Sequence, residues 1–184
     1  TQGVRIIAAT RVFVENCFIS GQNGSPGNGI TDERSTGGFL EVDNTTITNN
    51  TGNGISVNPI SGFTGINVHI SNSRLQGNGA SGLFVGSNVH AVVFNTVIAQ
   101  NVTAGVFAQQ TAGGSTEVNV DQSNVSNNIA GFQANTSNSL IRVSNSTAVS
   151  NSSLAVTAGG GQVSSYGNNQ TGGLAFPSTP TAQT

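Results

Sequence analysis

The residues best suited to chemistry are four ionisable side chains, Glu15, Glu41, Asp43 and His69, which occur in three segments of similar pattern. Each segment alternates apolar and polar residues, as a β-strand with one buried face does, and the four side chains occupy polar positions. Two carboxylates on one surface could act as the acid and the base of glycoside hydrolysis, with the histidine as a proton acceptor. Glu41, Asp43 and His69 are therefore candidate catalytic residues, and Glu15 is a candidate binding residue.

Two other interpretations of these side chains remain open. Carboxylates can hold Ca²⁺, and a bound Ca²⁺ would neutralise a uronate substrate. Alternatively, outward strand positions carry polar groups without any catalytic role, and Glu41 and His69 form an ordinary cross-strand pair. The residue types predict no other metal site and no cofactor.

A second candidate binding site is the charged run formed by Asp32, Glu33 and Arg34. Asp32 stands where a later segment of the same pattern has Val57, so its carboxylate is expected to point into the protein. A carboxylate in that position needs a hydrogen bond or an ion pair. Asp32 could cap its strand, pair with Arg34 or Arg5, or take part in catalysis.

These side chains are positioned by a repeat. Each copy has a strand with apolar residues at every second position, then a polar anchor residue, an apolar residue three places later and an Asn or Gln six places later. A Gly or another small residue then leads into a further apolar strand. Segments this short bury an apolar face only by stacking on neighbouring copies. The anchors follow one another at steps of 28, 28, 23, 27 and 23 residues, and they are Asn16, Asn44, Asn72, Asn95, Gln122 and Asn145.

The repeat predicts an all-β fold, a right-handed parallel β-helix of about six to seven coils with 23–28 residues each. The varying coil length excludes the left-handed class, which keeps a strict hexapeptide. Equivalent Asn side chains are expected to form hydrogen-bonded ladders along the axis. Residues 1–170 form the single domain and residues 171–184 a C-terminal tail. Val4 matches Ile30, so the chain opens in the middle of a coil, and we expect a missing N-terminal cap and self-association through the exposed edge.

Composition restricts the partners. Charged residues make up 7% of the chain and the net charge is −2, which argues against nucleic acid. There is no apolar run near twenty residues, so no membrane-spanning segment is predicted. The single cysteine, Cys17, excludes an internal disulfide and occupies a small-residue corner, where we expect it to be buried and inert.

The N-[ST]-x-[IVL]-x-x-N-x-x-x-G-[ILV] pattern resembles the right-handed parallel β-helix repeat proteins of the pectate-lyase-like superfamily, over about residues 3–170. The run G-I-T-D-E-R-S-T-G-G from Gly29 and the ending S-Y-G-N-N-Q are similar to a group of secreted bacterial β-helix proteins without an established activity. The resemblance implies a secreted or cell-surface bacterial protein. The superfamily includes pectin and alginate lyases, polygalacturonases, phage tailspikes and adhesins. The basic catalytic residue of the lyases and the paired-Asp motifs of the hydrolases have no match in this sequence.

Three hypotheses follow for the function. The first is a secreted, non-catalytic β-helix that binds carbohydrate or packs against partners. The alternative is a polysaccharide lyase or glycoside hydrolase that uses Glu41, Asp43 and His69. The third is a fragment of a fibre or tailspike-like assembly.

Overall fold

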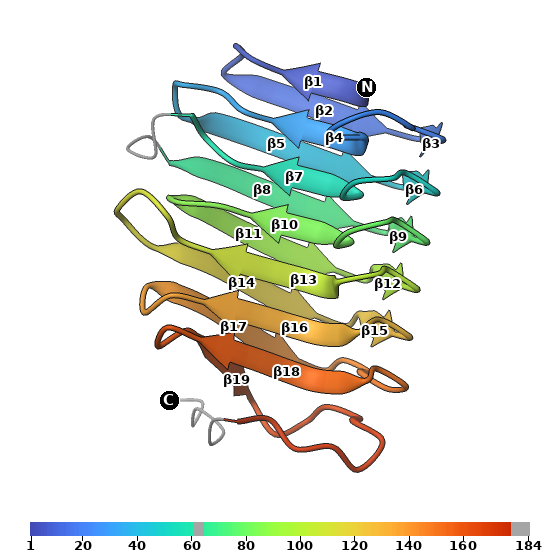
Figure 1. The fold of residues 1–184 in the computed structure, drawn as a ribbon, viewed down its shortest axis with the longest axis vertical. Coiled ribbons are helices and arrows are strands. Elements are labelled where there is room, and N and C mark those ends of the chain that lie inside the picture. The colour runs from blue at the N-terminus through green and yellow to red at the C-terminus, as the bar shows by residue number, and fades with distance from the viewer. Residues whose placement is uncertain (61–64, 178–184) are drawn as a thin grey trace.

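The computed structural model describes residues 1–60 and 65–177, and these residues wind into a right-handed parallel β-solenoid (Figure 1). The described residues contain no helix, and every strand pairing between coils is parallel. Each of the first five coils contributes one strand to each of three sheets, and the sixth coil continues the third sheet only by an isolated bridge at Thr147. These features confirm the predicted fold. The coils stack because a single coil is too short to bury its apolar side chains without the coils above and below it.

The three sheets run the length of the solenoid (Figure 1). Sheet A contains β1 (Gln2–Ile6), β4 (Asn28–Asp32), β7 (Ile55–Val57), β10 (Leu83–Val85), β13 (Ala104–Gln109), β16 (Ala130–Asn135) and β18 (Ser153–Ala158). Sheet B contains β2 (Arg11–Glu15), β5 (Gly38–Asp43), β8 (Ile66–Ser71), β11 (Val89–Phe94), β14 (Thr116–Asp121), β17 (Ser139–Ser144) and β19 (Gln162–Ser165). Sheet C contains β3 (Phe18–Ser20), β6 (Thr46–Thr48), β9 (Arg74–Gln76), β12 (Val97–Ala99) and β15 (Asn124–Ser126).

The sharp bend between sheets B and C explains the anchor residue of the repeat. The anchors have a backbone φ of 45° to 55°, in the left-handed region that asparagine tolerates better than most residues. The pairing register also confirms the predicted coil lengths, since Asp43 lies opposite Glu15 on one side and Ser71 on the other. In this bend two residues, the anchor and the small residue after it, separate the strand of sheet B from the strand of sheet C.

The predicted asparagine ladder lies at the bend between sheets C and A. The side-chain Nδ2 of Asn78 donates to Oδ1 of Asn101 at 3.0 Å, and the backbone N–H of Asn78 donates to the same oxygen at 3.2 Å. The amide of Asn101 repeats both bonds with Asn128. From the second coil to the sixth, each coil is thus joined to the next by a buried amide pair, which leaves these polar groups satisfied inside the bend. The ladder runs through Asn50, Asn78, Asn101, Asn128 and Asn151.

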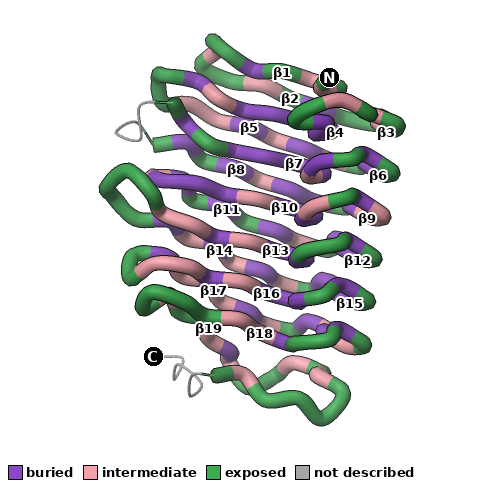
Figure 2. Tube along the Cα trace, viewed as in Figure 1, coloured by how far each residue is buried: buried purple, intermediate pink, exposed green. Residues whose placement is uncertain are grey.

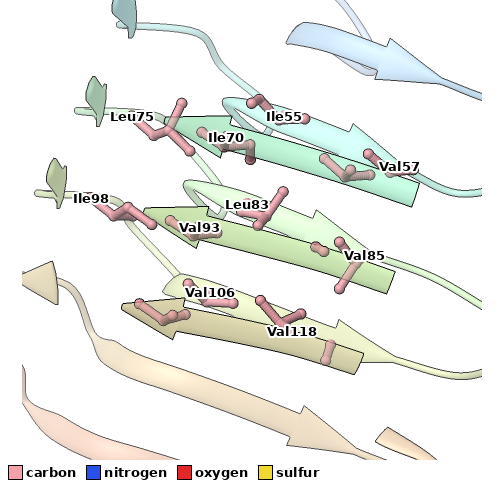
Figure 3. Packing of buried hydrophobic residues seen from close by; sticks show 14 of the residues in the cluster. Ile55, Val57, Ile70, Leu75, Leu83, Val85, Val93, Ile98, Val106 and Val118 are labelled. Carbon is pink, nitrogen blue, oxygen red and sulfur yellow. The ribbon is translucent and has the colours of Figure 1, made fainter. Parts of the chain in front are cut away.

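The core is a column of aliphatic side chains enclosed by the three sheets (Figures 2 and 3). Leu75 and Ile98 are fully buried in adjacent coils of sheet C. In each of the first five coils, this packing requires the glycine that precedes the inward apolar residue of sheet A. A Cβ atom on Gly82 would lie 2.5 Å from Cγ2 of Ile98 and 2.9 Å from Nδ2 of Asn101. A side chain at Gly82 would therefore collide with both the core and the ladder.

Two sequence-based expectations are wrong. Cys17 is exposed rather than buried, because it lies in the first coil, which is covered by another coil on one side only. The repeat also predicts Val156 as the inward apolar residue of the sixth coil, but Ala155 lies opposite Phe132 instead. Asn151 precedes Ala155 by four residues, the same interval as in the coil before and one less than the five of the second to fourth coils, so Val156 falls on the outward column.

The solenoid extends beyond the last complete coil. Asn169 accepts from the backbone of Ser146 at 2.8 Å and donates to the carbonyl of Val143 at 2.8 Å, so residues up to 170 form part of a seventh coil. Phe176 then packs on Phe132, with ring centroids 5.9 Å apart. The first part of the expected tail therefore covers the end of the core. Residues 178–184 of that tail lie outside the described residues.

Candidate functional site

The outer face of sheet B gathers most of the ionisable side chains. Among the seven carboxylates of the chain, five project from this face, together with both histidines and two of the five arginines. The predicted catalytic residues lie here, on the adjacent strands β5 and β8. The five carboxylates belong to Glu15, Glu41, Asp43, Glu117 and Asp121.

Glu41 and His69 form the cross-strand pair that the sequence suggested. They are register partners on β5 and β8, and Nδ1 of the imidazole lies 3.9 Å from Oε1 of the carboxylate. This separation is too long for a hydrogen bond. Both side chains remain open to solvent, with exposures of 28% and 40%. Glu41 and His69 are therefore neighbours, but no hydrogen bond between them fixes the orientation of the imidazole ring.

Asp43 is fixed by the following coil. Its Oδ1 accepts from the hydroxyl of Ser71 at 2.6 Å and from the amide of Asn72 at 2.8 Å. The hydrogen bond from Ser71, followed by that from Asn72, holds the pKa of Asp43 below its ordinary value of 3.8. A carboxylate with a lowered pKa is a weak proton acceptor and is ionised at neutral pH.

The same clamp recurs three coils further on, which indicates a structural role. Oδ1 of Asp121 accepts from the hydroxyl of Ser144 and from the amide of Asn145, both at 2.8 Å. At two places along the solenoid, an aspartate that precedes the anchor thus accepts hydrogen bonds from the Ser-Asn pair of the next coil. Because the same hydrogen bonds recur at Asp121, coil stacking explains why an aspartate occupies position 43, and a catalytic role is not required.

This clamp predicts a pH dependence for Asp43→Asn. Because the pKa of Asp43 is lowered in the folded state, ionisation stabilises the fold above pH 3.8, and this contribution is lost as the pH falls through the lowered pKa. We expect the variant to melt below the wild type near neutral pH, and the difference to shrink in more acidic buffers. Melting curves across that range test this, with the exposed Glu15→Gln as control. A difference that grew on acidification would contradict the clamp.

The charged run after β4 is divided between the core and the surface. Asp32 points inward, opposite Val57, and Arg34 folds back beside it, so that both side chains are fully buried. Nε and Nη2 of Arg34 donate to the two carboxylate oxygens at 2.9 and 2.5 Å, and Nη1 donates to the carbonyl of Ala9 at 2.6 Å. Of the alternatives for Asp32, the pair with Arg34 is the one that forms. The two charges satisfy each other inside the solenoid and are closed to ligands.

Glu33 remains on the surface, on sheet A, where it forms an ion pair with Arg5 of the preceding coil. The predicted site residues therefore fall into three places. The outer face of sheet B carries Glu15, Glu41, Asp43 and His69. The core contains the pair of Asp32 and Arg34, and Glu33 faces outward from sheet A.

A groove of about 360 Å³ lies beside Glu33, on the outer face of sheet A. Its floor is formed by Thr31 of β4 and Ser56 of β7, whose side chains are register partners. One wall comes from residues at or just before the start of the strands, including Pro26 and Asn28, and the other from residues after them, including Asn58 and Thr111. None of the three cavities described within residues 1–60 and 65–177 is lined by Glu41, Asp43 or His69.

The outward column of sheet A changes character beyond the groove. After Thr31 and Ser56, the next two coils place Phe84 and Phe107 in the same column. The two rings meet edge to face, with centroids 5.3 Å apart and an interplanar angle of 87°. Both side chains are half-buried, so a polar floor continues along the axis into an aromatic pair.

Sequence reasoning missed this groove, although a signal for part of it exists. Stacking the residue after each apolar position of the last strand gives the column Thr31, Ser56, Phe84 and Phe107 directly. The walls give no such signal, because they come from segments up to four coils apart, from Gln2 in β1 to Thr111 after β13.

Among the described residues, no three or more His, Cys, Asp and Glu side chains lie close enough together to hold a metal ion. The same part of the chain contains no helix with the length and apolarity needed to cross a membrane.

Three parallel sheets, left-handed asparagine bends and an internal amide ladder define a β-solenoid of the right-handed class. A family model described as right-handed beta helix region matches residues 2–170, and the chain belongs to this family. No curated protein and no solved structure gives a significant match.

Proposed function

We propose that this β-helix is a non-catalytic carbohydrate-binding protein and that its binding site is the groove over sheet A. The observation that carries the proposal is the polar floor of Thr31 and Ser56, which continues into the aromatic pair of Phe84 and Phe107. Hydroxyl and amide side chains both donate and accept hydrogen bonds, as sugar hydroxyls do. Aromatic rings supply the apolar contact area that orients a bound ligand.

The small number of carboxylates in the groove favours binding over hydrolysis. Glu33 is the one carboxylate among the residues that line it, and this group is engaged by Arg5. Glycoside hydrolysis by the common mechanisms needs two carboxyl groups on opposite sides of the scissile bond. The carboxylates of sheet B lie on a different face of the solenoid, where Asp43 is occupied by Ser71 and Asn72. We place the protein outside the cell, in secreted form or on a bacterial surface, where polysaccharides are accessible.

The proposal is tested with a panel of polysaccharides, with and without Ca²⁺. Binding is measured by affinity electrophoresis, and turnover is followed by the absorbance of unsaturated uronate ends and by reducing-sugar release. We expect binding to at least one glycan without turnover. Phe84→Ala should weaken that binding by about tenfold, since an aromatic contact contributes on the order of 1 kcal/mol beyond its buried area.

Phe39→Ala is the matched control, because Phe39 is a half-buried, outward-facing phenylalanine on sheet B that contacts Phe13. Equal loss of binding in Phe39→Ala and Phe84→Ala would argue against a site on sheet A. Turnover that disappears in Glu41→Gln would contradict the proposal and favour a lyase or hydrolase acting on the face of sheet B.

A further inference from the structure

The arginines of this chain are almost all occupied away from the groove. The chain has five arginines and no lysine. Arg34 is buried against Asp32, and Arg142 pairs with Glu117 on sheet B. On the surface, Arg11 lies 5.4 Å from the ring centroid of Phe39 on sheet B, and Arg74 donates to Gln76 on sheet C at 3.1 Å. Arg5 is the remaining arginine.

Arg5 does not give the groove a net positive charge. It lies in the same outward column as the groove floor, opposite Thr31, and its guanidinium contacts the carboxylate of Glu33. Glu33 lines the groove and is the less exposed partner, at 22% against 58% for Arg5. The amino group of Thr1 is outside the lining and donates to the carbonyl of Ser25 at 3.4 Å. The pair is neutral as a whole, with its negative end toward the groove.

The remaining polar groups of the groove are uncharged. Besides the floor, they are the side chains of Gln2, Asn28, Asn58 and Thr111. These groups can replace the water around sugar hydroxyls, but they offer no counter-charge to a carboxylate. A uronate bound here would lose part of its hydration without an ion pair, and it would approach Glu33. Neutralisation by a cation held on carboxylates would need several of them together, and among the described residues no three or more His, Cys, Asp and Glu side chains lie close enough to hold a metal ion.

We infer that the groove over sheet A selects uncharged glycans and excludes polyuronates, with Glu33 as the residue that sets this selectivity. The inference rests on the proposed function, since it specifies the ligand of the same groove. It also accounts for Arg5: a free arginine at this position would attract a polyanion, and its pairing with Glu33 prevents this.

The test compares ligands that differ in charge alone. Polygalacturonate and its fully methyl-esterified form share one backbone, and they are measured beside a set of neutral glucans, xylans and mannans at low and high salt. The wild type is expected to bind at least one uncharged polymer with an affinity independent of salt, and to bind polygalacturonate at least tenfold more weakly. Interactions between exposed charges weaken with salt, whereas neutral hydrogen bonding does not depend on screening.

Glu33→Gln provides the decisive variant because it leaves Arg5 unpaired beside the groove. We expect polygalacturonate affinity to rise by about tenfold, as a charge-assisted hydrogen bond would allow, and this gain should disappear at high salt. Glu117→Gln is the matched control. It frees Arg142 on sheet B and makes the same change in net charge, so it should not produce the gain.

The outcomes separate the two proposals. Wild-type protein that binds polygalacturonate as tightly as an uncharged polymer would overturn the inference and leave glycan binding intact. Retained binding of an uncharged glycan without any gain in Glu33→Gln, or an equal gain in Glu117→Gln, would overturn the role of Glu33. Failure to bind any polymer of the panel would overturn the proposed function, and the inference with it.

Discussion

Replacing Ile47 by aspartate is expected to unfold the stack around the second coil. Ile47 is fully buried on β6, between Ile19 of the coil before and Leu75 of the coil after. An aspartate there would place a carboxylate between the aliphatic side chains of the coils above and below. Burying an unpaired charge costs several kcal/mol, which is a large share of the roughly 5–15 kcal/mol that stabilises a folded domain.

Thermal and urea unfolding followed by circular dichroism measure this effect. Thr46→Asp is the matched control, since it introduces the same side chain one residue earlier on the outward face of the same strand. We expect the control to change the free energy of unfolding by no more than about 0.5 kcal/mol. Identical melting of Ile47→Asp and the wild type would contradict the assignment of Ile47 to the core.

The second large effect is expected for Arg34→Met. The substitution removes both hydrogen bonds to the carboxylate of Asp32 and the bond to the carbonyl of Ala9. Asp32 would then be a buried carboxylate without its partner, at a cost of about 3–5 kcal/mol. The free energy of unfolding should fall accordingly in urea titrations.

A double substitution separates the loss of the partner from the value of the pair. Val57 occupies the position opposite Asp32 in the next coil, so Asp32→Val fits the pattern of that column. We expect Asp32→Val combined with Arg34→Met to recover most of the stability, and the double-mutant cycle to give a large coupling energy. Arg142→Met, which breaks the partly exposed pair with Glu117, should cost less than about 1 kcal/mol. Equal costs for Arg34→Met and Arg142→Met would rule out the burial of the first pair.

The buried pair also connects the fold with the proposed site. Asp32 and Arg34 both enter the core, so the residue between them is held at the outer surface of sheet A. This residue is Glu33, the carboxylate that lines the groove. Disruption of the pair is therefore expected to alter glycan selectivity as well as stability.

The amino-acid sequence alone determined the architecture of the solenoid. Each coil buries its strands only against the next coil, so apolar residues, left-handed asparagines and ladder asparagines recur at matching positions. The intervals between anchors agree with the strand register, from Asn16 to Asn145. The outward columns of sheet B could be derived in the same way, which is why the pairing of Glu41 with His69 was foreseen.

Tertiary structure decided where a ligand could bind. The groove requires walls from residues near 28, 58 and 111, which belong to loops with no repeating pattern. Loop residues are not constrained by stacking, so their sequence does not reveal how they fold over the sheet. The inward turn of Arg34 and the clamp on Asp43 depend on contacts of single side chains, with Asp32 and with Ser71. The repeat therefore predicts the scaffold, because stacking imposes it on every coil, whereas the groove depends on non-repeating residues that meet only in the folded chain.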